Sequence, residues 1–192
     1  MGATARKDKS YSFSEYIEFE QSTNEKHDFY YGEVYNLAGG TIRHSQIIFS
    51  SSNILHKFLT KKNCITLTND VKLELDKDQF YVYPDVIVTC DNDDLSDNTE
   101  TIIKNPLIIV EILSDSTELY DRNIKKHYYL KLPSLKYYLL ISQKETRIEM
   151  YEKIENRIEY SSYETPEQEI NFQQLGFKIK IADIYTKQVL NK

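Results

Sequence analysis

Three residues in the middle of the chain are of types that together could hydrolyse a phosphodiester bond. Asp85 and Glu111 each lie in a short apolar run, within residues 83–88 and 107–113. A buried carboxylate is costly unless it is paired or binds a metal ion. Two carboxylates on adjacent strands can hold Mg²⁺, a hard cation that takes oxygen ligands. A lysine such as Lys125 can orient the attacking water or balance the developing charge, so the set indicates metal-assisted phosphodiester hydrolysis.

Each of these residues also has an ordinary structural interpretation. Asp85, directly after Pro84, could simply end a strand or cap a turn. Glu111 could form a buried ion pair with a basic side chain. Lys125 has Lys126 beside it, and most helical lysines are solvated. The residues alone therefore leave open whether Asp85 and Glu111 bind a metal, and which of the two lysines, if either, serves them.

The apolar periodicity predicts the elements that position these side chains. We expect buried strands at 80–90 and 107–113, a helix at about 119–132 and a further buried strand at 137–141. A strand, a helix and a strand make a βαβ unit, so the last two strands should be parallel. The helix would then carry Lys125 back over the end of the preceding strand.

The rest of the pattern is that of a mixed α/β protein. We expect helices at 12–21, 47–59 and 182–185, hairpins at 29–37 and 147–163, a loop at 91–105, and strands at 65–75 and 177–181. No linker, repeat or low-complexity tract is visible between residues 11 and 190. We therefore expect one domain over 11–190, preceded by ten disordered residues.

Composition and charge narrow the class of protein. The chain has 192 residues, of which 40% are hydrophobic and 28% charged, as in ordinary globular proteins. Lys and Arg total 24 against 30 Asp and Glu, for a net charge of −6. A nucleic-acid binder is more often basic, but the distribution of charge matters more than its sum. Basic residues gather in 121–136, directly after the Glu111 strand, and acidic ones in 91–100.

The cysteines and the N-terminus suggest a location. Cys64 and Cys90 lie far apart in the sequence and lack metal-ligand spacing, so we expect two buried free thiols, as suits a reducing compartment. No apolar stretch follows the first basic residues, so no signal peptide is visible. The longest apolar run, 107–113, is far too short to cross a bilayer. We expect a cytoplasmic protein with no membrane-embedded part.

A series of short stretches, in a specific order over residues 12–186, matches a known pattern. They are Tyr31-Gly32-Glu33-Val34-Tyr35, Ala38-Gly39-Gly40-Thr41 with His44, Asp70-Val71-Lys72, Tyr83-Pro84-Asp85-Val86, Val110-Glu111-Ile112-Leu113-Ser114, Tyr120-Asp121-Arg122 with Lys125 and Tyr129, and Pro133-Ser134-Leu135 with Tyr138. In this order and spacing the chain closely resembles the Uma2 family of endonucleases, also called DUF820, in the PD-(D/E)XK nuclease superfamily.

The resemblance implies a fold and a metal site. It implies a restriction-endonuclease-like core, in which helices flank a central mixed β-sheet. It also implies that Asp85 and Glu111 bind Mg²⁺, for which Mn²⁺ could substitute, with the Ile112 carbonyl as a third ligand. The superfamily pattern places a lysine at position 113, where this chain has Leu113. In this family the role of that lysine resembles one taken over by a lysine of the following helix, which in this chain implies Lys125.

Two further residues are weaker candidates. Glu33 could lie near the metal, as an early glutamate does in such nucleases, or could be a solvated residue after a turn. His44, with the glycines before its helix, could hold a phosphate at the helix N-terminus, although a capping turn explains the same residues. Asp115 stands where the family often has proline, and Asn123-Ile124 replaces a common Gly-Glu pair. These departures leave the loop shape and the substrate choice open.

Two functions of different class follow. The resemblance implies a Mg²⁺-dependent endodeoxyribonuclease that hydrolyses DNA, and a homodimer would suit the two strands of a duplex. The alternative is a non-catalytic nucleic-acid or protein interaction module on the same fold. The net charge of −6 and the lack of an appended DNA-reading domain motivate that alternative.

Overall fold

The computed structural model describes residues 9–37, 39–97 and 99–185, which form two main sheets and a small one. One sheet has the order β11-β10-β9-β8-β6-β3, and its strands are β3 (Ile65–Thr68), β6 (Val86–Thr89), β8 (Pro106–Leu113), β9 (Tyr137–Ser142), β10 (Ile148–Ile154) and β11 (Arg157–Tyr163). The other has the order β2-β1-β5-β4-β7, with β1 (His27–Tyr30), β2 (Glu33–Asn36), β4 (Lys72–Asp76), β5 (Phe80–Val82) and β7 (Ile102–Ile103). The pair β12 (Glu169–Phe172) and β13 (Phe177–Lys180) forms the third sheet.

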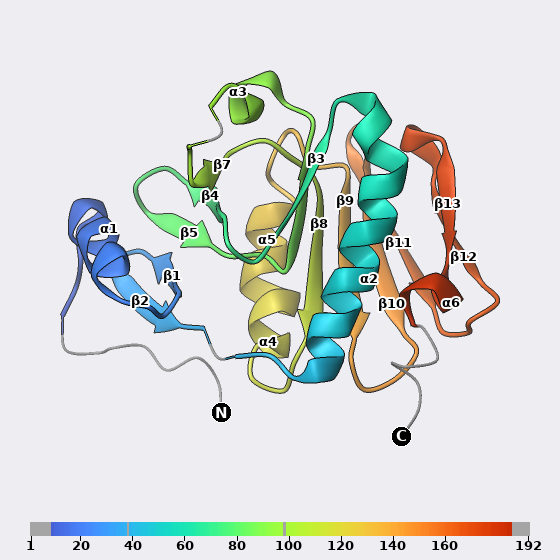
Figure 1. Cartoon of the computed structure of the whole chain (residues 1–192), viewed down its shortest axis with the longest axis horizontal. Helices are drawn as coiled ribbons and strands as arrows, with labels where there is room; N and C mark the ends of the chain where they lie inside the picture. Colours follow the sequence, from blue (N-terminus) through green and yellow to red (C-terminus); the bar gives the residue numbers. More distant parts are fainter. Residues whose placement is uncertain (1–8, 38, 98, 186–192) are drawn as a thin grey trace.

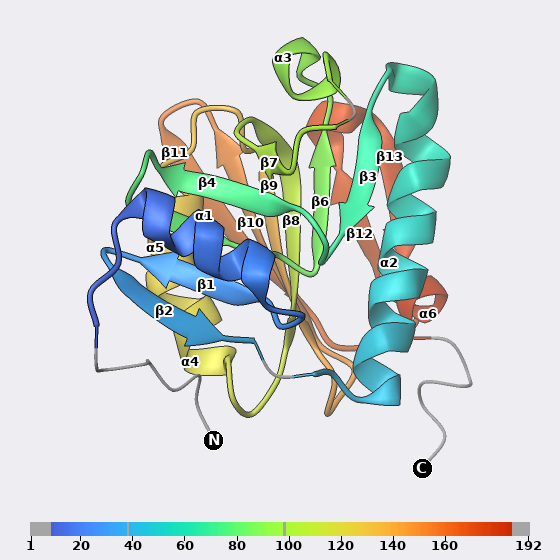
Figure 2. The same cartoon turned by 60° about the vertical axis from the view of Figure 1, so that its left-hand side comes forward.

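Helices lie on both faces of the six-stranded sheet and over the five-stranded sheet, as Figures 1 and 2 show. They are α1 (Phe13–Ser22), α2 (Ile42–Leu59), α3 (Asn92–Leu95), α4 (Glu118–Tyr120), α5 (Lys126–Tyr129) and α6 (Ile181–Ile184), with 3₁₀ turns η1 (Thr60–Lys62) and η3 (Gln173–Leu175) and a π turn η2 (Asp121–Lys125). The expected mixed α/β fold, with a central mixed sheet between helices, is confirmed. Of the ten residues expected to be disordered, 1–8 lie outside the described residues.

Strand β8 is buried between two helical layers, and its alternation decides which way Glu111 points. Val110 and Ile112 pack with α2 in one apolar cluster, whereas Ile109 and Leu113 pack with Tyr129 of α5 in another. Because successive side chains of a strand alternate between faces, Glu111 points toward α5. Strand β9 is parallel to β8, which confirms the predicted βαβ unit.

Two predicted strands are each divided between the two main sheets. The strand expected at 65–75 is β3 and then β4, and the strand expected at 80–90 is β5 and then β6. The second break falls at Tyr83-Pro84-Asp85, because proline has no N–H for a ladder and disfavours a regular central strand. The prediction of one continuous strand in each case is wrong. The chain instead crosses from one sheet to the other at Asp85.

The helix predicted at 119–132 exists but is irregular and shorter. It consists of α4, η2 and α5 and ends at Tyr129, four residues before Pro133. The predicted loop at 91–105 also contains α3 and β7, and β12 was not expected. No helix in the described part of the chain is long and apolar enough to cross a membrane.

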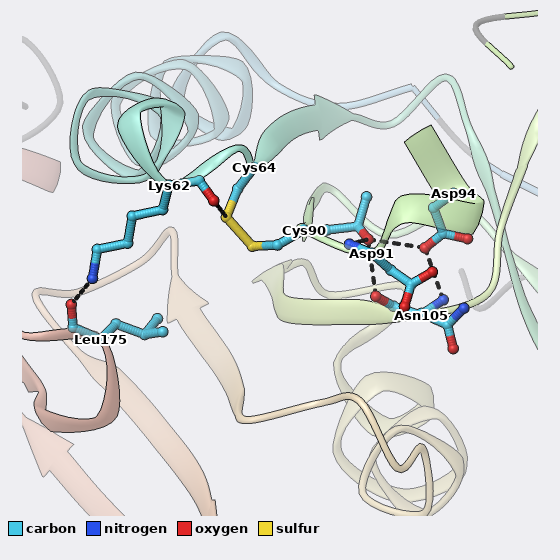
Figure 3. The surroundings of a disulfide bond; sticks show 8 residues. Lys62, Cys64, Cys90, Asp91, Asp94, Asn105 and Leu175 are labelled. Atoms are coloured by element: carbon cyan, nitrogen blue, oxygen red, sulfur yellow. Dashed lines mark hydrogen bonds between the residues drawn. A yellow bond between two sulfur atoms is a disulfide. The ribbon is translucent and has the colours of Figure 1, made fainter. Parts of the chain in front are cut away.

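The expectation of two free thiols is wrong, because Cys64 and Cys90 form a disulfide (Figure 3). Strands β3 and β6 are antiparallel, with Ile65 opposite Thr89. The next pair in that register is Cys64 and Cys90, whose Cα atoms lie 4.1 Å apart. Spacing in the sequence says nothing about strand register, so the pairing was not visible there. The disulfide also removes the free thiols on which the expected reducing compartment partly rested.

We predict that the disulfide stabilises the fold by closing a loop between residues 26 positions apart. The double variant Cys64→Ser/Cys90→Ser should lose roughly 3–4 kcal/mol of unfolding free energy, because the unfolded chain regains the entropy of that loop. Urea denaturation, with and without reductant, measures the difference. Reductant should weaken the wild type and leave the double variant unchanged. Equal midpoints for the wild type and the variant would contradict the prediction.

Candidate active site

Asp85 lies where the chain passes from the five-stranded to the six-stranded sheet. Its Oδ2 accepts a hydrogen bond of 2.7 Å from the Ile112 backbone N–H, and the His44 Nε2 atom lies 3.3 Å from the same oxygen. The side chain of Asp85 is 15% exposed and lines a pocket of about 1240 Å³. Asp85 is therefore held from two sides and still reaches open space.

Glu111 sits opposite this turn because β6 and β8 pair with Val86 beside Val110. Its Oε1 accepts hydrogen bonds from the Lys125 Nζ (3.0 Å) and from the Tyr129 hydroxyl (2.6 Å). Its Oε2 lies 3.4 Å from the backbone nitrogen of Asp85. One oxygen of Glu111 is thus fixed by the helix, and the other faces Asp85.

Lys125 is buried together with three carboxylates. Its Nζ lies 3.0 Å from Glu111, 3.2 Å from Asp121 and 3.9 Å from Asp28. Asp121 and Lys125 are the first and last residues of the π turn, which presents both to the sheet. Lys126, the other candidate, instead places its Nζ 5.0 Å above the ring of Tyr151. Of the two lysines, Lys125 is the one that contacts Glu111.

The charges of this cluster do not balance. Burial raises the pKa of Glu111 to about 8; Lys125 opposes this shift, while Asp121 and Asp85 add to it. Burial likewise raises the pKa of Asp28 to about 6. Burial alone would lower the pKa of Lys125, but the adjacent acids hold it well above its usual range, so this side chain stays a cation. The site carries an excess of negative charge that a bound cation would neutralise.

The structure separates two other candidates from the sequence. Ile112 lines the pocket with Asp85 and Glu111, so its backbone stands beside both carboxylates. Glu33 is exposed on β2, accepts a hydrogen bond from the Tyr35 hydroxyl and does not line the pocket. The acid that β1 and β2 supply to the cluster is Asp28, which is 1% exposed. The sequence did not indicate it, because Asp28 precedes the predicted hairpin at 29–37 and follows polar residues.

The N-terminus of α2 forms another wall of the pocket. Thr41 caps the helix by accepting a hydrogen bond from the His44 N–H, and its hydroxyl lies 2.8 Å from Gln143 Oε1. Gln143 in turn donates to the Leu113 carbonyl at the end of β8. Burial alone would lower the pKa of His44, but its interactions with Asp85 and with the Ile112 backbone outweigh that effect and raise it. These contacts hold His44 against Asp85.

The donor atoms fit a hard divalent cation. Asp85 and Glu111 offer carboxylate oxygens that line one pocket, and Ile112 adds a backbone position beside them. Mg²⁺ is commonly bound by one or two carboxylates, with waters and substrate phosphate completing its shell. Among the described residues, no group of three or more His, Cys, Asp or Glu side chains is already arranged to hold a metal ion. The site suits an ion that keeps several waters.

The fold and these side chains define a class: a mixed α/β domain with a restriction-endonuclease-like arrangement of two strand carboxylates and a lysine. A protein from Anabaena variabilis, described as a putative nuclease belonging to DUF820, has the same fold, with a TM-score of 0.73 and 14% identity over 92% of this chain and 98% of that one. The model of the Uma2 family, described as "Putative restriction endonuclease", matches residues 13–182. This chain belongs to the Uma2 family, which confirms the resemblance seen in the sequence.

Two curated relatives come from Synechocystis sp. (strain ATCC 27184 / PCC 6803 / Kazusa). The protein sll1609 is 33% identical over 144 residues, which is 75% of this chain and 81% of the relative. The protein slr1290 is 37% identical over 139 residues, which is 72% of each. The likeness therefore extends over most of each chain.

We predict that Asp28 lowers the stability of the fold. Its pKa is raised from 3.8 to about 6, so the folded state binds a proton more tightly than the unfolded chain does. Stability should therefore fall as pH rises from about 4 to 6 and stay reduced above that window. Asp28→Asn should remove this slope and add about 2–3 kcal/mol at pH 8.

Thermal and urea unfolding at pH 4 to 8 measure this effect. Asp78→Asn is a matched control, because Asp78 is exposed and has a positive φ that asparagine tolerates. The control should show no comparable change in slope. If Asp28→Asn is less stable than the wild type at pH 8, then the interaction of Asp28 with Lys125 outweighs its burial.

Proposed function

We propose that this protein is a Mg²⁺-dependent endodeoxyribonuclease. The observation that carries the proposal is that Asp85 and Glu111, from the two sides of one strand pair, line a pocket together while the buried cation Lys125 contacts Glu111. This combination is what phosphodiester hydrolysis requires of a protein. Membership of the Uma2 family supports a nuclease independently.

The contacts and charge of each residue indicate its role in the proposed reaction. Asp85, Glu111 and the Ile112 carbonyl would hold Mg²⁺, which neutralises charge on the phosphoryl oxygens and lowers the pKa of a bound water. With no metal ion bound, the adjacent acids hold the pKa of Lys125 well above its usual range, so its side chain is a cation. We therefore assign Lys125 to orienting the attacking water and balancing charge at phosphorus. Tyr129 and Asp121 position Lys125 and Glu111.

The substrate and assembly belong to the same proposal. DNA is the expected substrate, and a homodimer would place one site on each strand of a duplex. We place the protein in the cytoplasm, with access to DNA. Light scattering with and without a DNA duplex tests the dimer.

We predict that cleavage depends on each member of the site. Asp85→Asn and Glu111→Gln should abolish metal-dependent cleavage of plasmid DNA, because each removes a carboxylate charge while preserving shape. Lys125→Met should slow it by about 10²-fold or more. Cleavage is followed on gels with Mg²⁺ or Mn²⁺ and with chelator.

Two matched controls replace residues that lie close to Lys125 or line the same pocket but do not contact Asp85 or Glu111. Lys126→Met removes the adjacent lysine, and Asp115→Asn removes an acid of the same pocket that pairs with Lys144. Both should cleave like the wild type. Cleavage that survives Asp85→Asn and Glu111→Gln would contradict the mechanism. DNA binding without cleavage, unaffected by Asp85→Asn, would favour the non-catalytic interaction module.

We predict that Arg43 contacts a DNA phosphate. The basic side chains that line the mouth of the pocket include Lys26 and Lys144, which pair with Asp70 and Asp115. Arg43 lines the same pocket, and within the described residues its Nε has no hydrogen-bond partner. A guanidinium that lines this pocket and has an unbonded Nε suits a phosphate oxygen.

Arg43→Ala should weaken DNA binding and reduce the slope of log affinity against log salt by about 1. Lys144→Ala is the comparison, because its charge is already balanced by Asp115, and it should change the slope less. Fluorescence anisotropy with a catalytically inactive Asp85→Asn background measures both. An unchanged slope in Arg43→Ala would exclude the contact.

A further inference from the structure

We infer that His44 is a direct nitrogen ligand of the metal ion, so that the site prefers a first-row transition ion such as Mn²⁺ over Mg²⁺. This inference rests on the proposed function, because it needs a metal ion at Asp85. It goes beyond that function by adding a ligand from a different element and by changing the expected metal.

The His44 ring lies against the two oxygen donors that Asp85 and Ile112 supply. Its Nε2 is 3.3 Å from Asp85 Oδ2. Two ligands that each stand about 2.1 Å from one ion lie roughly 3.0–3.4 Å from each other, depending on coordination geometry. The imidazole nitrogen therefore lies next to Asp85 Oδ2 at a separation that one shared ion would allow.

The surrounding structure holds the ring in that place. His44 lies in the first turn of α2, and Thr41, Gln143 and the Leu113 carbonyl tie this helix end to β8. A side chain at Gly40 would put its Cβ 2.6 Å from His44 Nδ1, so glycine leaves the room that the ring needs. His44 is only 14% exposed. A merely capping residue would need neither the burial nor the contact with Asp85.

A nitrogen donor changes which ions fit. Mg²⁺ favours a shell of oxygen atoms, whereas imidazole is a good ligand for first-row transition ions. Mn²⁺ binds most weakly of that series, so a preference for Mn²⁺ over Mg²⁺ is a demanding criterion. The two ions have equal charge, so the excess of negative charge around Lys125 attracts both alike. The change in that preference when His44 is replaced reports on the nitrogen ligand.

The test uses the full chain without DNA and does not depend on cleavage. Calorimetry with Mn²⁺ and with Mg²⁺ gives the two affinities for the wild type, His44→Gln and Asp85→Asn. His56→Gln is the matched control, because His56 lies exposed near the other end of the same helix. Electron spin-echo envelope modulation of bound Mn²⁺ detects a coordinated nitrogen directly in the wild type, and circular dichroism checks the fold of each variant.

We expect the wild type to bind Mn²⁺ more tightly than Mg²⁺. His44→Gln should lose most of that preference and the nitrogen signal, and His56→Gln should keep both. If Asp85→Asn abolishes Mn²⁺ binding but the wild type shows no nitrogen signal, the role of His44 is overturned while the metal site stands. If the wild type binds neither ion, both proposals fail. An unchanged metal preference in His44→Gln would overturn the inference even if the metal site stands.

Discussion

The burial of Lys125 among three carboxylates is the constraint on which the arrangement of this fold depends. A buried cation is tolerated only where charge and hydrogen bonds replace water. Here the partners come from distant places: Asp28 from β1, Glu111 from β8 and Asp121 from the π turn. The two main sheets and the helix must therefore meet at one point before the lysine is paired. The negative charge left over after that pairing would favour a cation in the pocket.

A second constraint acts at the break between β5 and β6, close to the carboxylates that surround Lys125. Where the chain leaves one ladder for the next, its backbone N–H groups need new acceptors. Tyr83 donates to Asp28, Asp85 approaches Glu111, and Pro84 between them has no N–H to satisfy. The same two acids thus bind Lys125 and complete the sheet crossover. Asp28 is buried and adds to the excess of negative charge. It nevertheless belongs to the hydrogen-bond network that positions Asp85.

Much of this site was predictable from the sequence, and the remainder was not for identifiable reasons. An acid in an apolar run identified Asp85 and Glu111, and the βαβ pattern placed Lys125 over β8. Asp28 could not be identified, because it precedes the predicted hairpin at 29–37 and no apolar run surrounds it to indicate burial. The Cys64–Cys90 pairing depends on the register of β3 and β6, which local patterns do not specify. Glu33 was misplaced for a related reason: the turn after β1 exposes it, while Asp28 two strand positions before that turn is covered.

The position of Lys125 on a helix rather than on a strand has a consequence for how the cluster around it forms. Leu113, two residues after Glu111 on β8, packs into the apolar cluster beneath α5. A lysine at that position would be in place as soon as β8 paired. Lys125 instead reaches Glu111 only when the π turn and α5 dock, through Tyr129 and the apolar contacts around it. Local opening of this short helix would separate the Lys125 cation from Glu111 and Asp28 without disturbing the sheet. The site is therefore complete only when this helical segment is packed against the sheet. Residues 114–117, which line the pocket and lead directly into α4, can influence the site through that segment.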